Sequence, residues 1–392
     1  MKKKIYGYQL MLLIILSCVG SIFLVTVQER AIGTAAWLAL LCSFPAGLAI
    51  NLLFLLLFKR SNYDTISRIN VAAFGPAGNA VTVVYCLYFL LGASLLLNYY
   101  GIFTVSIILR QMQLTFFILP IVFLIGWAAQ SGVTVIGRMA VIFSYILLGT
   151  VAVTFLFELP YVQWENIFPL FYTDTGSFLK MAFLFAFIQF GDLMAVFCLL
   201  PYVENKEKII KKSLISVSIG VGIVVLFAFL NALVLGEVLS RQYSAFLRVM
   251  RLVDLGRIIN RLEVLVFAGY FFATVFRLMV EYTVVVSNLR DALHLNKKTP
   301  RSFSGWAVLL GAGAALAICS ILIAPATEDT MRFITNVYPY IAIVVQIALP
   351  AATHIALSLR QVAKSRYAKH ATTRKKEKPK LQKTARYWQP RQ

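Results

Sequence analysis

Long apolar stretches separated by short polar segments run through most of the chain. A helix needs about 20 residues to cross roughly 30 Å of hydrocarbon, and ten stretches reach or approach that length. They cover residues 8–28, 33–58, 79–109, 115–131, 138–157, 179–200, 213–236, 261–286, 304–324 and 336–359. The pattern predicts an all-α polytopic membrane protein, with a ten-helix transmembrane domain over residues 1–360 and a tail over 361–392.

The composition excludes most soluble classes of protein. Of the 392 residues, 60% are hydrophobic and 14% are charged, whereas charged residues make up about a quarter of an ordinary soluble domain. All five cysteines lie in apolar stretches without a CxxC pair, which indicates small buried side chains rather than disulfides or metal ligands. A soluble enzyme and a secreted disulfide scaffold are therefore excluded.

The net charge of +21 lies mainly in the segments between apolar stretches. The segment 360–392 alone holds twelve Lys or Arg and one acidic residue. With the N-terminus in the cytoplasm, 27 of the 37 Lys and Arg residues fall on that side, Arg138 among them. Because cytoplasmic loops are enriched in Lys and Arg, the charge predicts two cytoplasmic termini and no nucleic-acid partner.

Two basic segments are expected to contact lipid. Residues 241–261 hold five arginines between apolar residues at helical spacing, which predicts an amphipathic helix at the interface. The polar tail over 361–392 is predicted to be disordered and attracted to anionic lipid.

The chain contains no recognisable catalytic motif. HExxH, GxxxxGK[ST] and GxSxG are all absent, and the three histidines lack companions at metal-ligand spacing. We therefore predict no catalytic residues, no metal and no cofactor.

Asp192 is the most informative ionisable residue because it lies about 13 residues into the sixth stretch. At 1.5 Å per residue this is roughly 20 Å deep, where a charge is expensive and usually functional. Gly191 and Gln189 are its neighbours, which indicates an interrupted helix that lines a cavity. The alternative is a hydrogen-bonded Asp192 that only holds helices together.

The first stretch contains a matching weak point, formed by Ser17, Gly20 and Ser21 at a similar depth. The first and sixth stretches start five spans apart, and an odd number of spans per repeat inverts the second copy. Two interrupted helices in opposite halves point to a transporter-type binding site. Ser17, Gly20, Ser21, Gln189, Gly191 and Asp192 are therefore the ligand-binding candidates.

The eighth stretch carries four charged residues as coupling or structural candidates: Arg261, Glu263, Arg277 and Glu281. Arg277 and Glu281 are four residues apart and can share a helix face. Arg277 either forms a buried ion pair or extends toward the cytoplasmic headgroups. Glu263 is expected to pair with an arginine of the preceding segment, such as Arg257.

The chain contains the segments Ile167-Phe168-Pro169-Leu170, Gly176, Phe190-Gly191-Asp192, Pro201 and Arg261-Leu262-Glu263-Val264-Leu265. At these segments most clearly, and over about residues 5–360 as a whole, it resembles the B subunits of spore germinant receptors, the GerAB-like family of the amino acid–polyamine–organocation superfamily. The resemblance implies a leucine-transporter-type fold of two inverted five-helix repeats, with a pocket between helices one and six. It also implies the spore inner membrane as the location, with A-type and C-type receptor subunits as partners.

These observations favour a non-enzymatic receptor subunit. It would bind a germinant of the amino acid, sugar or nucleoside class between helices one and six and signal to its partner subunits. The alternative is an amino acid permease that uses the same pocket with ion coupling.

Overall fold

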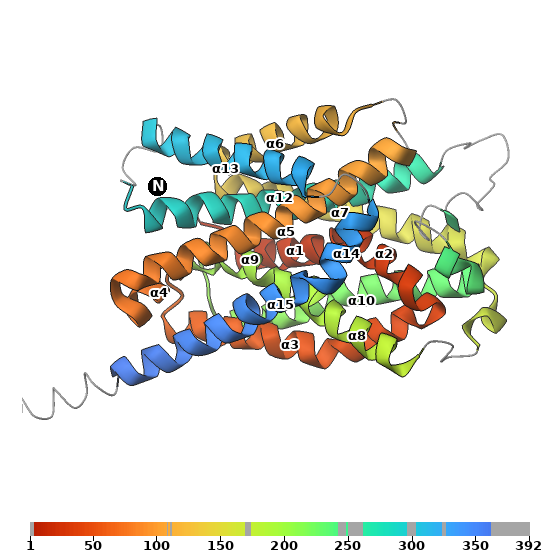
Figure 1. The fold of residues 1–392 in the computed structure, drawn as a ribbon, viewed down its shortest axis with the longest axis horizontal. Helices are drawn as coiled ribbons and strands as arrows, with labels where there is room; N and C mark the ends of the chain where they lie inside the picture. The colour runs from red at the N-terminus through yellow and green to blue at the C-terminus, as the bar shows by residue number, and fades with distance from the viewer. Residues whose placement is uncertain are drawn as a thin grey trace, which may run out of the picture.

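The computed structural model describes residues 4–107, 109, 112–168, 174–241, 248–249, 262–295, 303–323 and 327–361. In these ranges the chain forms a bundle of helices along one long axis (Figure 1) and no strand, only one bridge between Ile5 and Val203. Nine of the described helices are long and apolar enough to cross a membrane. The first predicted span adds a shorter apolar helix, α1 (Gly7–Val19), because it is broken in the middle.

The first and sixth spans are interrupted where the sequence predicts. In the first span, Gly20 and Ser21 separate α1 from α2 (Ile22–Ile32). In the sixth span, α8 (Thr175–Phe185) passes into a π-helical turn, η5 (Ala186–Phe190), and a 3-10 turn, η6 (Gly191–Leu193). The short α9 (Met194–Phe197) follows and lies beside α1 in the middle of the bundle (Figure 1).

The remaining spans follow the predicted order, with ends shifted by a few residues. They are α3 (Ala36–Arg60), α5 (Gly78–Ile107), α6 (Leu114–Ser131), α7 (Val133–Glu158), α10 (Ile209–Leu235), α12 (Leu262–Ala292), α13 (Phe303–Leu322) and residues 338–361, which begin with α15 (Tyr338–Ala342) and η9 (Ile343–Ala348). Two short helices were not predicted, α4 (Ile66–Phe74) and α14 (Thr327–Asn336), because neither is long enough to cross a bilayer. Arg138 lies inside α7 and not in the preceding loop.

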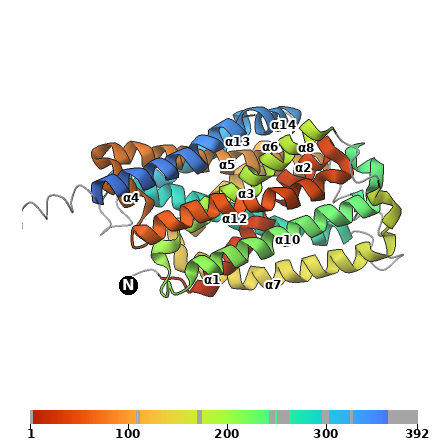
Figure 2. The same ribbon diagram turned by 90° about the horizontal axis from the view of Figure 1, so that it is seen from below.

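Burial separates a central set of helices from a peripheral set. The sixth span and α12 are almost wholly buried, whereas only a small part of α6 and α7 is buried. Figure 2 shows α12 inside the bundle and α7 at its edge. Since apolar side chains at the edge are stable in hydrocarbon, this distribution fits an integral multi-pass membrane protein with a polar centre.

Both ends of the described chain lie at the same end of the bundle. The N-terminus and the end of the last helix both lie on the left in Figures 1 and 2. An even number of crossings produces this arrangement. The predicted interfacial helix over 241–261 and the tail over 362–392 lie outside the described residues, apart from residues 241 and 248–249.

Candidate functional site

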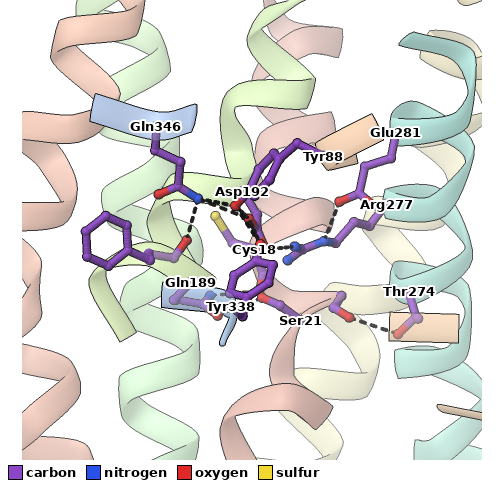
Figure 3. Close-up of polar contacts among 12 residues, drawn as sticks. Cys18, Ser21, Tyr88, Gln189, Asp192, Thr274, Arg277, Glu281, Tyr338 and Gln346 are labelled. Carbon is purple, nitrogen blue, oxygen red and sulfur yellow. Dashed lines mark hydrogen bonds and ion pairs between the residues drawn. The ribbon is translucent and has the colours of Figure 1, made fainter. Parts of the chain in front are cut away.

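Asp192 lies in η6 at the interruption of the sixth span and gathers polar groups from three other spans (Figure 3). Its Oδ1 accepts hydrogen bonds from Tyr88 Oη (2.7 Å), Gln346 Nε2 (3.1 Å) and, at very short range, Tyr338 Oη. Its Oδ2 lies 3.0 Å from Arg277 Nη2. A buried carboxylate with a cation and several donors is well compensated in low dielectric.

Arg277 joins two carboxylates. Besides its contact with Asp192, its Nε donates to Glu281 Oε1 at 2.9 Å, and the side chains of Arg277 and Glu281 are only 2% and 4% exposed. Arg277 is therefore a buried ion-pair partner and does not extend to the headgroups. With one cation for two carboxylates, the three side chains together carry a formal charge of −1.

The local chain conformation explains why Asp192 faces this network. The π-helical turn and the following 3-10 turn change the helical register just before Asp192, as such turns often do at functional sites. Gly191 has no side chain, and the Gln346 amide packs where a Cβ would lie. From there Gln346 Nε2 also reaches Phe187 O, at 3.1 Å.

The interruption of the first span contacts that of the sixth. Gln189 Nε2 donates to Cys18 O at 2.9 Å, and Ser21 Oγ lies 2.6 Å from both Gln189 Oε1 and Cys18 O. The single hydroxyl proton of Ser21 serves one of these acceptors at a time. The Cys18 carbonyl beside the break therefore has hydrogen-bond partners, and the break in the first span is connected to η5 through Gln189.

Gly20 allows the first span to pack directly on α12. A Cβ on Gly20 would lie 2.6 Å from Ala273 O, closer than side chains approach. The Gly20 carbonyl accepts a hydrogen bond of 3.0 Å from Thr274 Oγ1. The first, sixth and eighth spans therefore meet within one layer of polar contacts (Figure 3).

The structure thus brings together most of the residues that the sequence singled out. Gly20, Ser21, Gln189, Gly191, Asp192, Arg277 and Glu281 belong to one connected region. Ser17 is buried in α1, but its Oγ has no hydrogen-bond partner among the described residues. The side chains of Arg261 and Glu263 lie outside the described residues, as does the expected Arg257 contact.

Three network residues were not identified from the sequence: Tyr88, Tyr338 and Gln346. Each is a polar side chain inside an apolar stretch, which was the only available signal. Tyr88 and Tyr338 also stack on each other, with ring centroids 5.8 Å apart.

A small cavity of about 10 Å³ adjoins Asp192 and Tyr338. A cavity of this size holds about one water molecule. Apart from Asp192 and Tyr338, the lining is apolar: Leu24, Gly92, Leu95, Ile188 and Ile334. The space beside Asp192 in this conformation therefore admits no more than a very small molecule.

The fold and the buried polar centre define a transporter-type membrane protein with interrupted helices. A solved structure with a similar fold is a Na⁺-coupled sialic acid symporter in a substrate-bound outward-open state, with a TM-score of 0.62 and 13% sequence identity. The match covers 88% of this chain and 80% of the symporter chain. It confirms the leucine-transporter-type fold.

A family model described as "Spore germination protein" matches residues 4–328, so the chain belongs to the spore germination permease family. No curated protein matches the chain. The predicted family and fold class are therefore confirmed, and membership places the chain among spore germination permeases and not among enzymes.

Proposed function

We propose that this protein is a germinant receptor subunit that binds a small molecule at the Asp192–Arg277 pair. It would lie in the spore inner membrane with both termini in the cytoplasm, and its basic tail would be a separate disordered segment. A-type and C-type receptor subunits would be its signalling partners. Family membership supports the germination role, and the buried ion pair beside a small cavity supports the binding site.

The buried pair favours a zwitterionic amino acid among the possible germinants. Opening the Asp192–Arg277 contact would leave Asp192 as a buried anion, which is strongly unfavourable, whereas Arg277 would keep Glu281 as its partner. An α-amino acid carries an ammonium group that can compensate Asp192, and its carboxylate can take the place of Asp192 beside Arg277. A sugar or nucleoside without an ammonium group would leave Asp192 uncompensated.

Binding would be coupled to a change in helix packing. A cavity of about 10 Å³ is too small for an amino acid, so the helices around Asp192 must separate when a ligand enters. A ligand that binds only the open arrangement shifts the population toward it. The partner subunits would then respond to the altered surface of the bundle.

A binding experiment on the purified full-length chain in lipid nanodiscs tests this proposal. A panel of labelled amino acids, sugars and nucleosides would be screened, with Asp192→Asn and Arg277→Gln as site variants and Glu165→Gln as an exposed control. We expect saturable binding of an amino acid that weakens at least tenfold in both site variants. Binding that is unaffected by both variants would contradict the site.

The transporter alternative predicts uptake as well as binding. Proteoliposomes containing the chain would be loaded with buffer and exposed to the bound amino acid, with and without an ion gradient. Accumulation that is driven by the gradient would favour a permease. Binding without accumulation, together with loss of germination in spores that lack the gene, would favour the receptor.

A further inference from the structure

A second pair of carboxylates is buried away from Asp192. Glu29 in α2 and Glu158 at the end of α7 are 1% and 0% exposed. Glu29 lies nine residues beyond Gly20, or about 13 Å along a helix axis. The pair lies toward the end of the bundle opposite the N-terminus, where α7 and α10 finish (Figure 2).

The two carboxylates lie near each other and carry charge of the same sign. They are close enough to interact electrostatically, and the interaction is repulsive. Within the described residues neither takes part in an ion pair. Isolated buried carboxylates are expensive in low dielectric, and two neighbouring ones of the same sign are worse.

The surrounding polar groups leave oxygen atoms without donors. Asn231 Nδ2 of α10 donates to Glu29 Oε2 at 3.2 Å, but Asn231 Oδ1 has no partner among the described residues. Both oxygens of Glu158 are likewise without a hydrogen-bond partner there. Tyr99 of α5 lies near Glu29 and Tyr270 of α12 near Glu158, so five helices surround the pair.

We propose that Glu29, Glu158 and Asn231 form a binding site for a hard metal cation. Carboxylate and amide oxygens are the ligands preferred by alkali and alkaline-earth ions, and the group contains no sulfur or imidazole ligand. A bound cation would offset both buried charges and use the oxygens that lack donors. Protonation would also neutralise the carboxylates and would add an O–H donor, so the test below includes low pH without any metal ion.

The bound cation would hold the C-terminal ends of three helices together. Glu29, Glu158 and Asn231 come from α2, α7 and α10, and α2 leads directly into the interruption at Gly20 and Ser21. Cation occupancy would therefore fix the position of the helix segment that borders the Asp192 region. Cation binding at this site would not require a germinant of any particular kind.

The test uses the purified full-length chain at constant ionic strength, with choline chloride replaced stepwise by the chloride of Na⁺, K⁺, Mg²⁺ or Ca²⁺. Thermal unfolding and equilibrium dialysis with a radioactive isotope of the stabilising ion would be measured together. We expect saturable stabilisation by at least one ion. We also expect at least a tenfold loss of its affinity in Glu29→Gln and Glu158→Gln, and none in the exposed control Glu165→Gln.

The glutamine variants keep the shape of the side chains and remove the buried charge, so we expect them to fold. In the absence of metal ions they should unfold at a higher temperature than the parent chain. Three outcomes would overturn the site. The first is that no metal ion changes the unfolding temperature relative to choline, and the second is that the parent chain and the glutamine variants bind the ion equally well. The third is that lowering the pH without any metal ion raises the unfolding temperature as much as the ion does.

Discussion

Arg277 Nη2 lies 3.0 Å from Asp192 Oδ2, and Arg277 Nε lies 2.9 Å from Glu281 Oε1. One cation on α12 therefore serves a carboxylate on its own helix and another at the interruption of the sixth span. The two contacts differ in kind. The contact with Glu281 is local, between residues four apart. The contact with Asp192 connects residues 85 positions apart in the chain.

The charge balance of this trio predicts unequal effects of removing its members. Asp192→Asn leaves the neutral pair of Arg277 and Glu281, so we expect a loss of at most about 1–2 kcal/mol in unfolding free energy. Arg277→Gln leaves two buried carboxylates without their cation, and we expect a loss of about 3–5 kcal/mol. Thermal unfolding of the purified variants in the same detergent measures both.

The matched control for this prediction is the double variant Asp192→Asn with Arg277→Gln. It retains only one buried carboxylate, so it should be more stable than Arg277→Gln alone. If Asp192→Asn proved as damaging as Arg277→Gln, the charge argument would be wrong.

Gly191 is expected to be intolerant of a side chain because Gln346 packs against it. A methyl group on Gly191 would displace the Gln346 amide, which bonds to Asp192, Tyr88 and Phe187 O. We expect Gly191→Ala to lower stability by about 1–3 kcal/mol and to weaken ligand binding. Thermal unfolding and ligand titration would be compared with those of the parent chain.

Gly222→Ala is the control, because a Cβ there meets nothing within 4 Å and Ala favours a helix. The double variant Gly191→Ala with Gln346→Ala removes the side chain that the new methyl group would collide with. It should therefore relieve the collision without restoring the lost hydrogen bonds. A Gly191→Ala protein as stable as Gly222→Ala would show that this packing is unimportant.

Much of the fold could be predicted because hydrophobic length along the chain determines which segments cross the bilayer. The interruptions were also visible, because Gly20 with Ser21 and Gly191 with Asp192 are polar or small residues at mid-depth. The extra helix α4 was missed because apolar length is a poor signal for helices that do not cross.

The partners of Asp192 were harder to foresee. Glu281 was recognisable beside Arg277 because helical spacing fixes a contact four residues away. No comparable rule connects Asp192 to Tyr88 or Tyr338, which lie 104 and 146 residues away in the chain. Such contacts depend on how the spans pack, and a single sequence contains no direct record of that packing.

Close approach of α1 and α12 predicts that Gly20→Ala will be more damaging than Gly191→Ala. The atom opposing the new methyl group is the backbone carbonyl of Ala273, 2.6 Å away, and backbone cannot rotate aside as a side chain can. The helices must separate, which also stretches the 3.0 Å bond between Thr274 Oγ1 and Gly20 O. We expect at least about 3 kcal/mol of destabilisation from overpacking and the lost bond.

Thermal unfolding of Gly20→Ala would be measured beside Gly149→Ala, where a Cβ meets nothing within 4 Å. Spores that carry Gly20→Ala should also lose their response to the germinant. An unaltered unfolding temperature and a normal response would contradict this close packing.

Tyr338 is expected to stabilise the Asp192 site through its hydroxyl group as well as through the burial of its ring. Its hydroxyl donates to Asp192 Oδ1 and lies 2.6 Å from Tyr88 Oη, and hydrogen bonds to a charged group are worth about 1.5–3 kcal/mol. Tyr338→Phe should therefore destabilise the protein by about that amount, whereas Tyr145→Phe at the bundle surface, where the side chain is 73% exposed, should have little effect.

A double-mutant cycle of Tyr338→Phe with Asp192→Asn isolates the free energy of the hydrogen bond between the two side chains. We expect a coupling free energy above about 1 kcal/mol, because a neutral amide at residue 192 attracts the hydroxyl less than a carboxylate does. Additive effects in the cycle would mean that the phenol stabilises the site only by packing against Tyr88.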